Sequence, residues 1–218
     1  MRAPGWLKTP ARLMLQGLGA YGSYKLAHGS FLARAGWFRS FREGRSVDAE
    51  GNPLPWIPYP AIRFLAGRVG RDFSVFEFGA GASTLWWAGR VARLVSCEHD
   101  PRWLAEIEGK LTANVTLLRR PLDENGEYAR AIAGYPGSFD VVVVDGRDRV
   151  LCARNAIAAL KPGGVIVWDD TDRPEYGPGI EFLTRQGFRR LEFIGMAPGK
   201  VEGGETSIFY REGNCLGI

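Results

Sequence analysis

One ten-residue segment, Val75–Thr84, constrains the fold of this chain more than any other. It reads Val-Phe-Glu-Phe-Gly-Ala-Gly-Ala-Ser-Thr, an apolar run that ends at an acid and continues into Gly79 and Gly81. The Leu-Trp-Trp-Ala sequence that follows is typical of a helix, and Ser83 and Thr84 are residue types that cap a helix N-terminus. The segment therefore predicts a strand, a tight loop and a helix start. In that arrangement backbone N–H groups face a bound ligand, which a side chain at either glycine would hold away.

Strand-like and helix-like runs alternate along the chain beyond residue 70. The expected strands lie at residues 73–78, 93–98, 115–119, 139–145, 165–169, 188–194 and 206–211. The expected helices lie at residues 83–91, 101–111, 124–134, 150–160 and 176–186, with a Pro/Gly turn at 161–164 and a long loop at 195–205. This order predicts an α/β fold, a doubly wound and mostly parallel sheet that closes with a terminal strand pair. Four consecutive valines in the fourth strand predict that it is central and covered on both faces.

The first 60 residues differ from the rest in charge and composition. The chain of 218 residues has a net charge of +4, but residues 1–46 hold eight basic side chains and one acid, so the remainder is slightly acidic. Weak helical periodicity over residues 6–38 precedes four prolines within residues 53–60, which predict a stiff strap. We predict an N-terminal helical and Pro-rich extension over residues 1–60 and a main domain over residues 61–218. The strap is expected to be a lid over the ligand pocket; a structural clasp against the sheet is the alternative.

Carboxylates follow every predicted strand of the parallel part of the sheet. In doubly wound sheets ligands bind at the edge where the parallel strands end. The acids at that edge are Glu77, Glu98, Asp100, Asp123, Asp145, Asp169 and Asp170. Glu98 lies 19 residues after Gly79, an interval that suits a carboxylate holding two ribose hydroxyls. The pattern predicts a site for a ribose-containing ligand.

Taken in order, these motifs resemble those of class I S-adenosylmethionine-dependent methyltransferases. The resemblance rests on Glu77-x-Gly79-x-Gly81-x-Ser83-Thr84, on Glu98, on Phe139–Gly146 and on Leu160–Gly164, and it covers roughly residues 60–211. It implies the seven-stranded sheet of that family, with a closing antiparallel strand pair. It also implies S-adenosylmethionine as the cofactor.

The resemblance implies which residues hold that cofactor. The two glycines would approach its methionyl part, with Glu77 near its amino group. Glu98 would hold the ribose, and Leu122 with Asp123 would lie near the adenine. The complete set implied is Glu77, Phe78, Gly79, Ala80, Gly81, Ser83, Thr84, Glu98, His99, Leu122, Asp123 and Asp145. A rim of carboxylates complements a cofactor that carries a sulfonium and an ammonium group.

A magnesium site is a further implication of the resemblance. Asp145 with Asp169 and Asp170 is similar to the Asp … Asp-Asn/Asp triplet of magnesium-dependent O-methyltransferases. Three convergent carboxylates repel one another unless a cation or a proton joins them, and oxygen ligands suit Mg²⁺. Arg147 and Arg149 provide the alternative, because they can neutralise the cluster without a metal.

The expected reaction is methyl transfer to a hydroxyl oxygen of a small molecule or glycan. The Asn/Asp-Pro-Pro-Tyr/Phe sequence common in enzymes that methylate amino nitrogens is replaced here by Asp145-Gly-Arg-Asp. A hydroxyl acceptor needs a base, and the candidate catalytic residues are Asp145, Asp170 and His99.

Other functions remain open at the sequence level. A non-catalytic module that binds the cofactor as a partner or regulatory subunit would carry the same motifs. An NAD(P)-dependent oxidoreductase would need a third glycine where Thr84 stands. The basic extension permits an RNA methyltransferase, but no appended RNA-binding domain is evident, so nucleic acid is not an expected partner.

The remaining signals concern location and assembly. Cys97, Cys152 and Cys215 lack metal-ligand spacing and predict free thiols in a reducing compartment, so a cytoplasmic location is expected. No apolar stretch approaches membrane-spanning length. The basic N-terminus is compatible with peripheral contact with anionic lipid, and the chain is compatible with a homo-oligomer.

Overall fold

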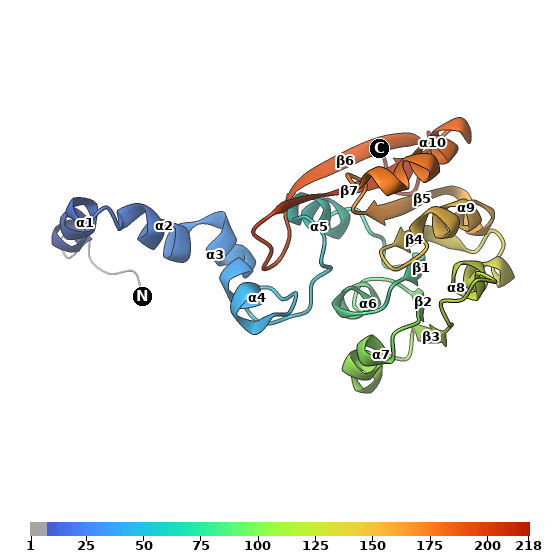
Figure 1. The fold of residues 1–218 in the computed structure, drawn as a ribbon, viewed down its shortest axis with the longest axis horizontal. Helices are drawn as coiled ribbons and strands as arrows, with labels where there is room; N and C mark the ends of the chain where they lie inside the picture. Colours follow the sequence, from blue (N-terminus) through green and yellow to red (C-terminus); the bar gives the residue numbers. More distant parts are fainter. Residues whose placement is uncertain (1–7) are drawn as a thin grey trace.

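The computed structural model describes residues 8–218 and confirms the predicted α/β fold (Figure 1). Its seven strands are β1 (Ser74–Phe78), β2 (Arg93–Glu98), β3 (Val115–Arg119), β4 (Phe139–Val144), β5 (Leu160–Asp169), β6 (Arg189–Met196) and β7 (Gly203–Tyr210). They form one sheet in the order β3-β2-β1-β4-β5-β7-β6. The strands from β3 to β5 pair in parallel, and β7 pairs antiparallel with both β5 and β6. The terminal strand pair is therefore present, with β7 as the inner strand.

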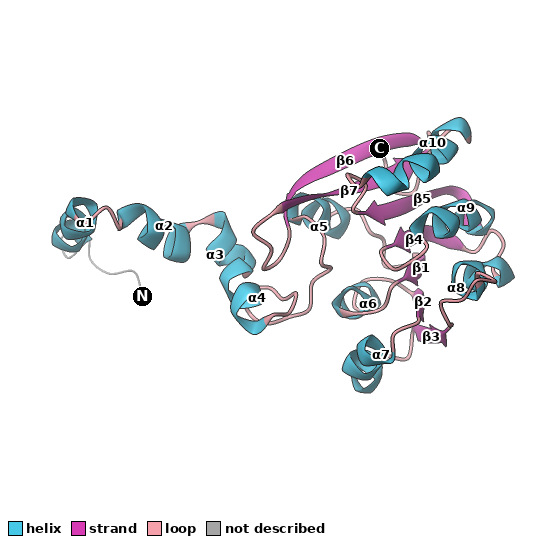
Figure 2. Ribbon diagram, viewed as in Figure 1, coloured by secondary structure: helices cyan, strands magenta, loops and turns pink. Residues whose placement is uncertain are grey.

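Helices cover both faces of the sheet (Figure 2). Those of the main domain are α5 (Tyr59–Ala66), α6 (Ala82–Ala88), α7 (Pro101–Ile107), α8 (Glu127–Arg130), α9 (Arg149–Ala159) and α10 (Gly177–Arg185). Figure 2 shows α5, α6 and α7 on one side of the sheet and α8, α9 and α10 on the other. Three single turns of 3-10 helix, η2 (Glu108–Lys110), η3 (Ala131–Gly134) and η4 (Pro174–Tyr176), extend the shorter helices.

Strand β4 shows why a run of valines belongs at the sheet centre. Val142 and Val144 pack in the apolar cluster beneath α9 and α10, with Trp168 of β5. Val141 and Val143 pack in the opposite cluster, with the helices α5 and α6. Because successive strand residues point to opposite faces, the four valines supply apolar side chains to both layers of helices.

The N-terminal extension forms four short helices, α1 (Lys8–Gly17), α2 (Tyr21–Gly29), α3 (Phe31–Ala35) and α4 (Trp37–Glu43). Helices α1 and α2 project away from the sheet as an arm (Figure 1), while α3 packs against the apolar cluster of the main domain through Leu32 and Ala35. Leu13, Met14 and Leu18 of the arm are each more than 60% exposed. The part of the extension predicted at residues 1–7 lies outside the described residues. Within residues 8–218 no helix is both long and apolar enough to cross a bilayer.

Several boundaries differ from those expected. The Pro/Gly turn at residues 161–164 is part of β5, because Leu160 pairs with Phe139 and a register shift absorbs the glycines. The predicted helix at residues 124–134 is only the single turn of α8 followed by η3. The long loop at residues 195–205 shrinks to residues 197–202, since β6 and β7 stay paired as far as Met196 and Gly203.

The loop after β1 makes a close backbone contact that can be tested by mutation. Gly79 has φ +97°, and a Cβ there would lie 2.7 Å from the carbonyl oxygen of Asp145. We expect Gly79→Ala to lower the free energy of unfolding by about 2–4 kcal/mol, because backbone strain adds to a steric clash. Gly137→Ala is the matched control: its φ is +58° and no heavy atom lies within 4 Å, so it should cost only about 1–2 kcal/mol. Urea unfolding measures both; equal losses would contradict the clash.

Candidate functional site

The carboxyl ends of β1, β2, β4 and β5 surround a cavity of about 610 Å³. Its lining comes from the loops after these strands, from helix α7, from residues 44–56 of the extension, and from the β6–β7 loop. The residues that matter below are Arg45, Trp56, Gly79, Ala80, Gly81, Ser83, Glu98, His99, Asp100, Trp103, Asp145, Arg147, Arg149, Asp169, Asp170, Arg173 and Lys200. Its volume is in the range of small-molecule sites.

The glycine turn that opens the site is held from below by Thr84. Gly81 occupies the N-cap position of α6, and its N–H donates to the Thr84 hydroxyl at 3.0 Å. That hydroxyl in turn donates to a carboxylate oxygen of Glu77 at 2.6 Å. Ser83 and Thr84 were predicted to cap α6, and Thr84 does so from the third helical position, by accepting from the N–H of the N-cap residue. Gly81, which has no side chain to fill the cavity, takes the N-cap position itself.

Glu77 is fully buried beneath the turn. One of its oxygens accepts hydrogen bonds from Thr84 and from Ser96, each at 2.6 Å, while the other oxygen has no partner. Burial raises the pKa of Glu77 to about 7, although the hydrogen bonds from nearby hydroxyls oppose the shift. An unpartnered buried carboxylate oxygen next to the turn suits a cationic ligand group.

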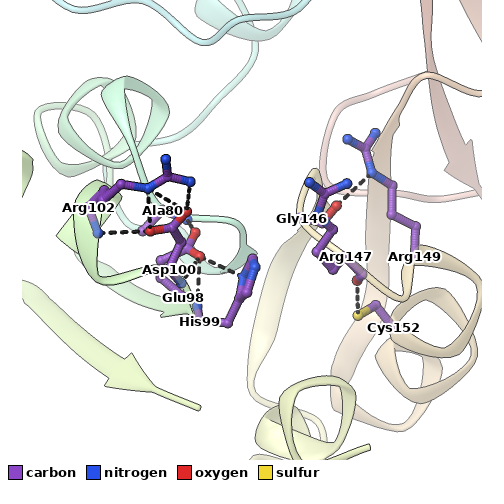
Figure 3. A network of polar contacts seen from close by, with 9 residues as sticks. All are labelled: Ala80, Glu98, His99, Asp100, Arg102, Gly146, Arg147, Arg149 and Cys152. Atoms are coloured by element: carbon purple, nitrogen blue, oxygen red, sulfur yellow. Dashed lines mark hydrogen bonds and ion pairs between the residues drawn. The ribbon is translucent and has the colours of Figure 1, made fainter. Parts of the chain in front are cut away.

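Glu98 joins the two loops on the other side of the cavity (Figure 3). One oxygen accepts from the Ala80 N–H at 2.9 Å, and the other accepts from the N–H groups of His99 and Asp100 at 2.7 Å each. Nδ1 of His99 also lies 2.7 Å from Glu98. Glu98 therefore fixes the loop after β1 relative to the start of α7, which sequence spacing alone did not reveal. Any ribose it holds shares its oxygens with these backbone donors.

A buried arginine lies among the three aspartates at the ends of β4 and β5. Arg149 of α9 approaches the carboxylates of Asp145 at 3.2 Å, Asp170 at 3.0 Å and Asp169 at 3.9 Å. It also donates to the carbonyl oxygens of Gly146 at 3.0 Å and Asp169 at 2.6 Å. Asp170 adopts φ +60°, a strained conformation for a non-glycine residue at the point where its carboxylate meets Arg149.

Burial and the charges within the cluster shift the pKa values of its members. Desolvation raises the pKa of Asp145 to about 7, and Arg149 limits the rise. Burial and the neighbouring carboxylates raise the pKa of Asp169 as well. The arginine itself keeps a raised pKa, because the three carboxylates outweigh its own desolvation.

These contacts do not fit the predicted magnesium site. A cation at the centre of Asp145, Asp169 and Asp170 would meet the guanidinium of Arg149, which already occupies that position. No group of three or more His, Cys, Asp or Glu side chains in the described chain is arranged to hold a metal. The alternative reading, neutralisation by arginine, matches the geometry, and Arg149 rather than Arg147 makes the contacts.

The strap closes one side of the cavity and is fastened to the β6–β7 loop. The Trp37 indole donates to the carbonyl oxygen of Lys200 at 2.7 Å, and Trp56 donates to that of Pro198 at 2.7 Å. A Cβ on Gly199 would lie 2.9 Å from the Phe41 nitrogen, so α4 and this loop are in close contact. Strap and loop therefore form one wall.

Not all the predicted cofactor residues line the cavity. Glu77, Phe78 and Thr84 are fully buried and support it from below. Leu122 and Asp123 lie outside its lining, where Asp123 accepts from the Glu127 N–H at the start of α8. Their contact with an adenine remains a prediction. The remaining members of the set, together with Asp169 and Asp170, surround the cavity.

Sequence reasoning did not predict that three basic residues from separate segments would line one cavity. Arg45, Arg147 and Lys200 line the cavity from three separate segments. Nothing in their local sequence signals this, because the three meet only when the strap and the β6–β7 loop fold over the sheet. The excess of basic residues before residue 46 is the one partial signal, and it concerns Arg45 alone.

Comparison with known proteins indicates the type of domain. Residues 76–171 match the family model described as a methyltransferase domain. That part of the chain resembles a methyltransferase domain. The matched range runs from β1 to the residue after Asp170, so it includes the glycine turn, Glu98 and the Arg149 cluster. No curated protein sequence matches the chain.

Solved structures show the same fold. The precorrin-8w decarboxylase of Methanobacterium thermoautotrophicum is 20% identical, with a TM-score of 0.55, covering 78% of this chain and 97% of that one. The precorrin-6y C5,15-methyltransferase of Geobacter metallireducens is 20% identical, with a TM-score of 0.51 and coverage of 69% and 85%. An rRNA methylase of Streptococcus thermophilus is 13% identical, with a TM-score of 0.50 and coverage of 68% and 92%. At these identities the likeness establishes the class I fold and leaves the acceptor open.

The family match and the site agree about the cofactor. The family match supports S-adenosylmethionine-dependent methyl transfer. The carboxylates that line the cavity around the glycine turn fit a cofactor with an ammonium and a sulfonium group. The same neighbourhood offers no cradle for a pyrophosphate, because Thr84 fills the position of a third glycine.

Glu98 should matter for stability as well as for binding. We expect Glu98→Gln to lower the free energy of unfolding by about 1–3 kcal/mol, because an amide replaces a charged acceptor of three backbone N–H groups. Glu106→Gln changes an exposed acid of the same cavity and should be neutral. Urea unfolding of both variants tests this; a stable Glu98→Gln would show that the backbone contacts contribute little.

Arg149 should hold the aspartate cluster together. Arg149→Gln leaves three neighbouring carboxylates without their cation, and we expect a loss of about 3–5 kcal/mol in the free energy of unfolding at pH 8. The loss should be smaller at pH 6: the carboxylate pKa values lie above their unfolded values, so protonation at lower pH favours the folded state. Arg154→Gln alters an exposed arginine of the same helix and is the control. A pH-independent loss would contradict this account.

Proposed function

We propose that this protein transfers a methyl group from S-adenosylmethionine to a hydroxyl oxygen of a small molecule or glycan. One observation carries the proposal: a single cavity joins the glycine turn and Glu98 to Asp145, and the strap closes its other side. Cofactor and acceptor can therefore meet in one enclosed space. The strap, within the extension over residues 1–60, is assigned to the acceptor side.

Asp145 is the residue we assign as the base. It lines the cavity at the end of β4, and its pKa of about 7 allows it to be ionised and still accept a proton near neutral pH. Asp170 is less suited, because two guanidinium groups, those of Arg149 at 3.0 Å and Arg173 at 2.8 Å, already occupy its carboxylate. His99 is held against Glu98, on the side of the cavity assigned to the ribose.

The chemistry requires only alignment, a base and the exclusion of water. The bound cofactor supplies an electrophilic methyl group on a sulfonium. A lone pair of the acceptor oxygen forms the new bond to the methyl carbon, the bonding pair of the C–S bond returns to sulfur, and the hydroxyl proton passes to Asp145. The products are a methyl ether, S-adenosylhomocysteine and the protonated aspartate. The strap and the β6–β7 loop hold the acceptor in line and limit access of water.

Binding of S-adenosylhomocysteine tests the cofactor assignment. We expect calorimetry to give a dissociation constant in the micromolar range, with affinity that increases from pH 6 to pH 8, because Glu77 must lose its proton to face an ammonium group. Glu77→Gln should weaken binding and flatten this pH dependence. Folded protein that shows no binding at millimolar ligand would refute the cofactor assignment.

Transfer of label tests catalysis. Incubation with methyl-labelled S-adenosylmethionine and a small-molecule extract should give a labelled product, and Asp145→Asn should reduce its rate by about 100-fold or more. The wild-type rate should rise with pH through about 7 as Asp145 ionises. Activity should survive excess EDTA, since Arg149 occupies the position a metal would need. Cofactor binding without any transfer would favour a non-catalytic binding module.

A further inference from the structure

We propose that the acceptor carries an anionic group, a carboxylate or a phosphate, which Arg45, Arg147 and Lys200 bind. This inference rests on the proposed function, because it concerns the acceptor side of the same cavity. It adds the chemical class of the acceptor, which neither the fold nor the comparisons give.

The three cations differ from the other arginines of the cavity in having no acidic partner. Arg102 is paired with Asp100 at 2.7 Å, and Arg149 and Arg173 are paired with aspartates at 3.2 Å or less. Among the described residues, no carboxylate lies within 4.0 Å of the charged groups of Arg45, Arg147 or Lys200, although all three line the cavity. Lys110 is also unpaired, but it belongs to η2 on the α7 side.

Three of the four unpaired cations in the cavity lining come from segments other than the α7 side, where Lys110 lies. Arg147 follows β4, Arg45 lies in the loop between α4 and the strap, and Lys200 belongs to the β6–β7 loop. The opposite side carries Glu98 and Asp100, and hydrogen bonds from Arg102 hold the pKa of Asp100 at about 2, so that it stays ionised. Figure 3 shows Arg147 and Arg149 across from the group that contains Glu98, His99 and Asp100. The acidic side complements the positive charge of the cofactor, and the basic side complements the negative charge of an anion.

Contacts with neighbouring segments hold the backbone that carries Lys200 and Arg45. Lys200 lies over the ring of Trp56 at 5.0 Å, and its own carbonyl accepts from Trp37. Arg45 precedes Ser46, which is buried and accepts a backbone hydrogen bond from Leu54 at 3.0 Å. Fixing these segments in advance reduces the entropy lost when a ligand binds.

Electrostatics makes a neutral acceptor a poor match. Like charges in an enclosed site repel strongly, so three unneutralised cations beside a sulfonium would weaken cofactor binding. An anionic group on the acceptor removes that repulsion and places its own charge next to all three. Planar guanidinium groups suit carboxylates and phosphates, which accept two hydrogen bonds side by side.

Matched probes test the proposal on the full-length protein loaded with S-adenosylhomocysteine. Calorimetry is carried out with phenyl phosphate and benzoate as anionic probes and with benzyl alcohol as the neutral one. We expect the anions to bind at least about tenfold more tightly than the alcohol, and more weakly at high salt. The double variant Arg45→Gln/Lys200→Gln, and separately Arg147→Gln, should weaken anion binding by about tenfold or more. Arg63→Gln removes an exposed cation of α5 outside the cavity and should change nothing.

The outcomes separate the two proposals. If S-adenosylhomocysteine does not bind the wild-type protein, the proposed function fails. If it binds but the anions bind no better than benzyl alcohol, the anionic acceptor is refuted while the function stands. If the variants lose affinity for S-adenosylhomocysteine and keep it for the anions, the cations serve the cofactor's own carboxylate, and the acceptor proposal is wrong. Circular dichroism of each variant shows whether it has folded.

Discussion

The guanidinium of Arg149 lies among three carboxylates at the ends of two neighbouring strands, and much of the site depends on this contact. It ties the loop after β4 to the end of β5 through Asp145 and Asp170, and it also donates to two carbonyl oxygens. Burying three acids so close together is costly unless a positive charge accompanies them. The chain supplies that charge from its own helix α9, so the edge of the sheet holds its shape with no added ion.

A second constraint is the close approach of the glycine turn to the loop after β4. Gly79 lies against the backbone of Asp145, and Gly146 lies against Tyr128, leaving no room for a Cβ at either position. Glu98 fixes the same turn from the other side through the N–H of Ala80. The turn is thus held on two sides, by contacts that leave its upper surface open to the cavity. A cofactor that binds there would contact backbone groups of the turn that are already in position.

Charge is divided across the cavity in a way that follows from the chain path. The acids come from the ends of the parallel strands, the edge at which doubly wound sheets bind their ligands. The unpaired cations come mainly from segments outside these strands, the loop before the strap and the β6–β7 loop. In such an arrangement, the sequence of the segments that form the acceptor side can change with little effect on the sheet. The exposed apolar side chains of the arm have no assigned partner, and contact of the arm with lipid or with another copy of the chain stays a prediction.

The sequence by itself determined the sheet, the position of the glycine turn and most of the acidic rim, because apolar periodicity and Gly-x-Gly spacing are local properties. It could not determine the role of Glu98 as a bridge between loops, the replacement of a metal by Arg149, or the meeting of Arg45, Arg147 and Lys200. Each of these joins residues far apart in the chain. Their contacts exist only after the helices, the strap and the hairpin pack around the sheet, and no local pattern records which distant side chain will neutralise a buried charge.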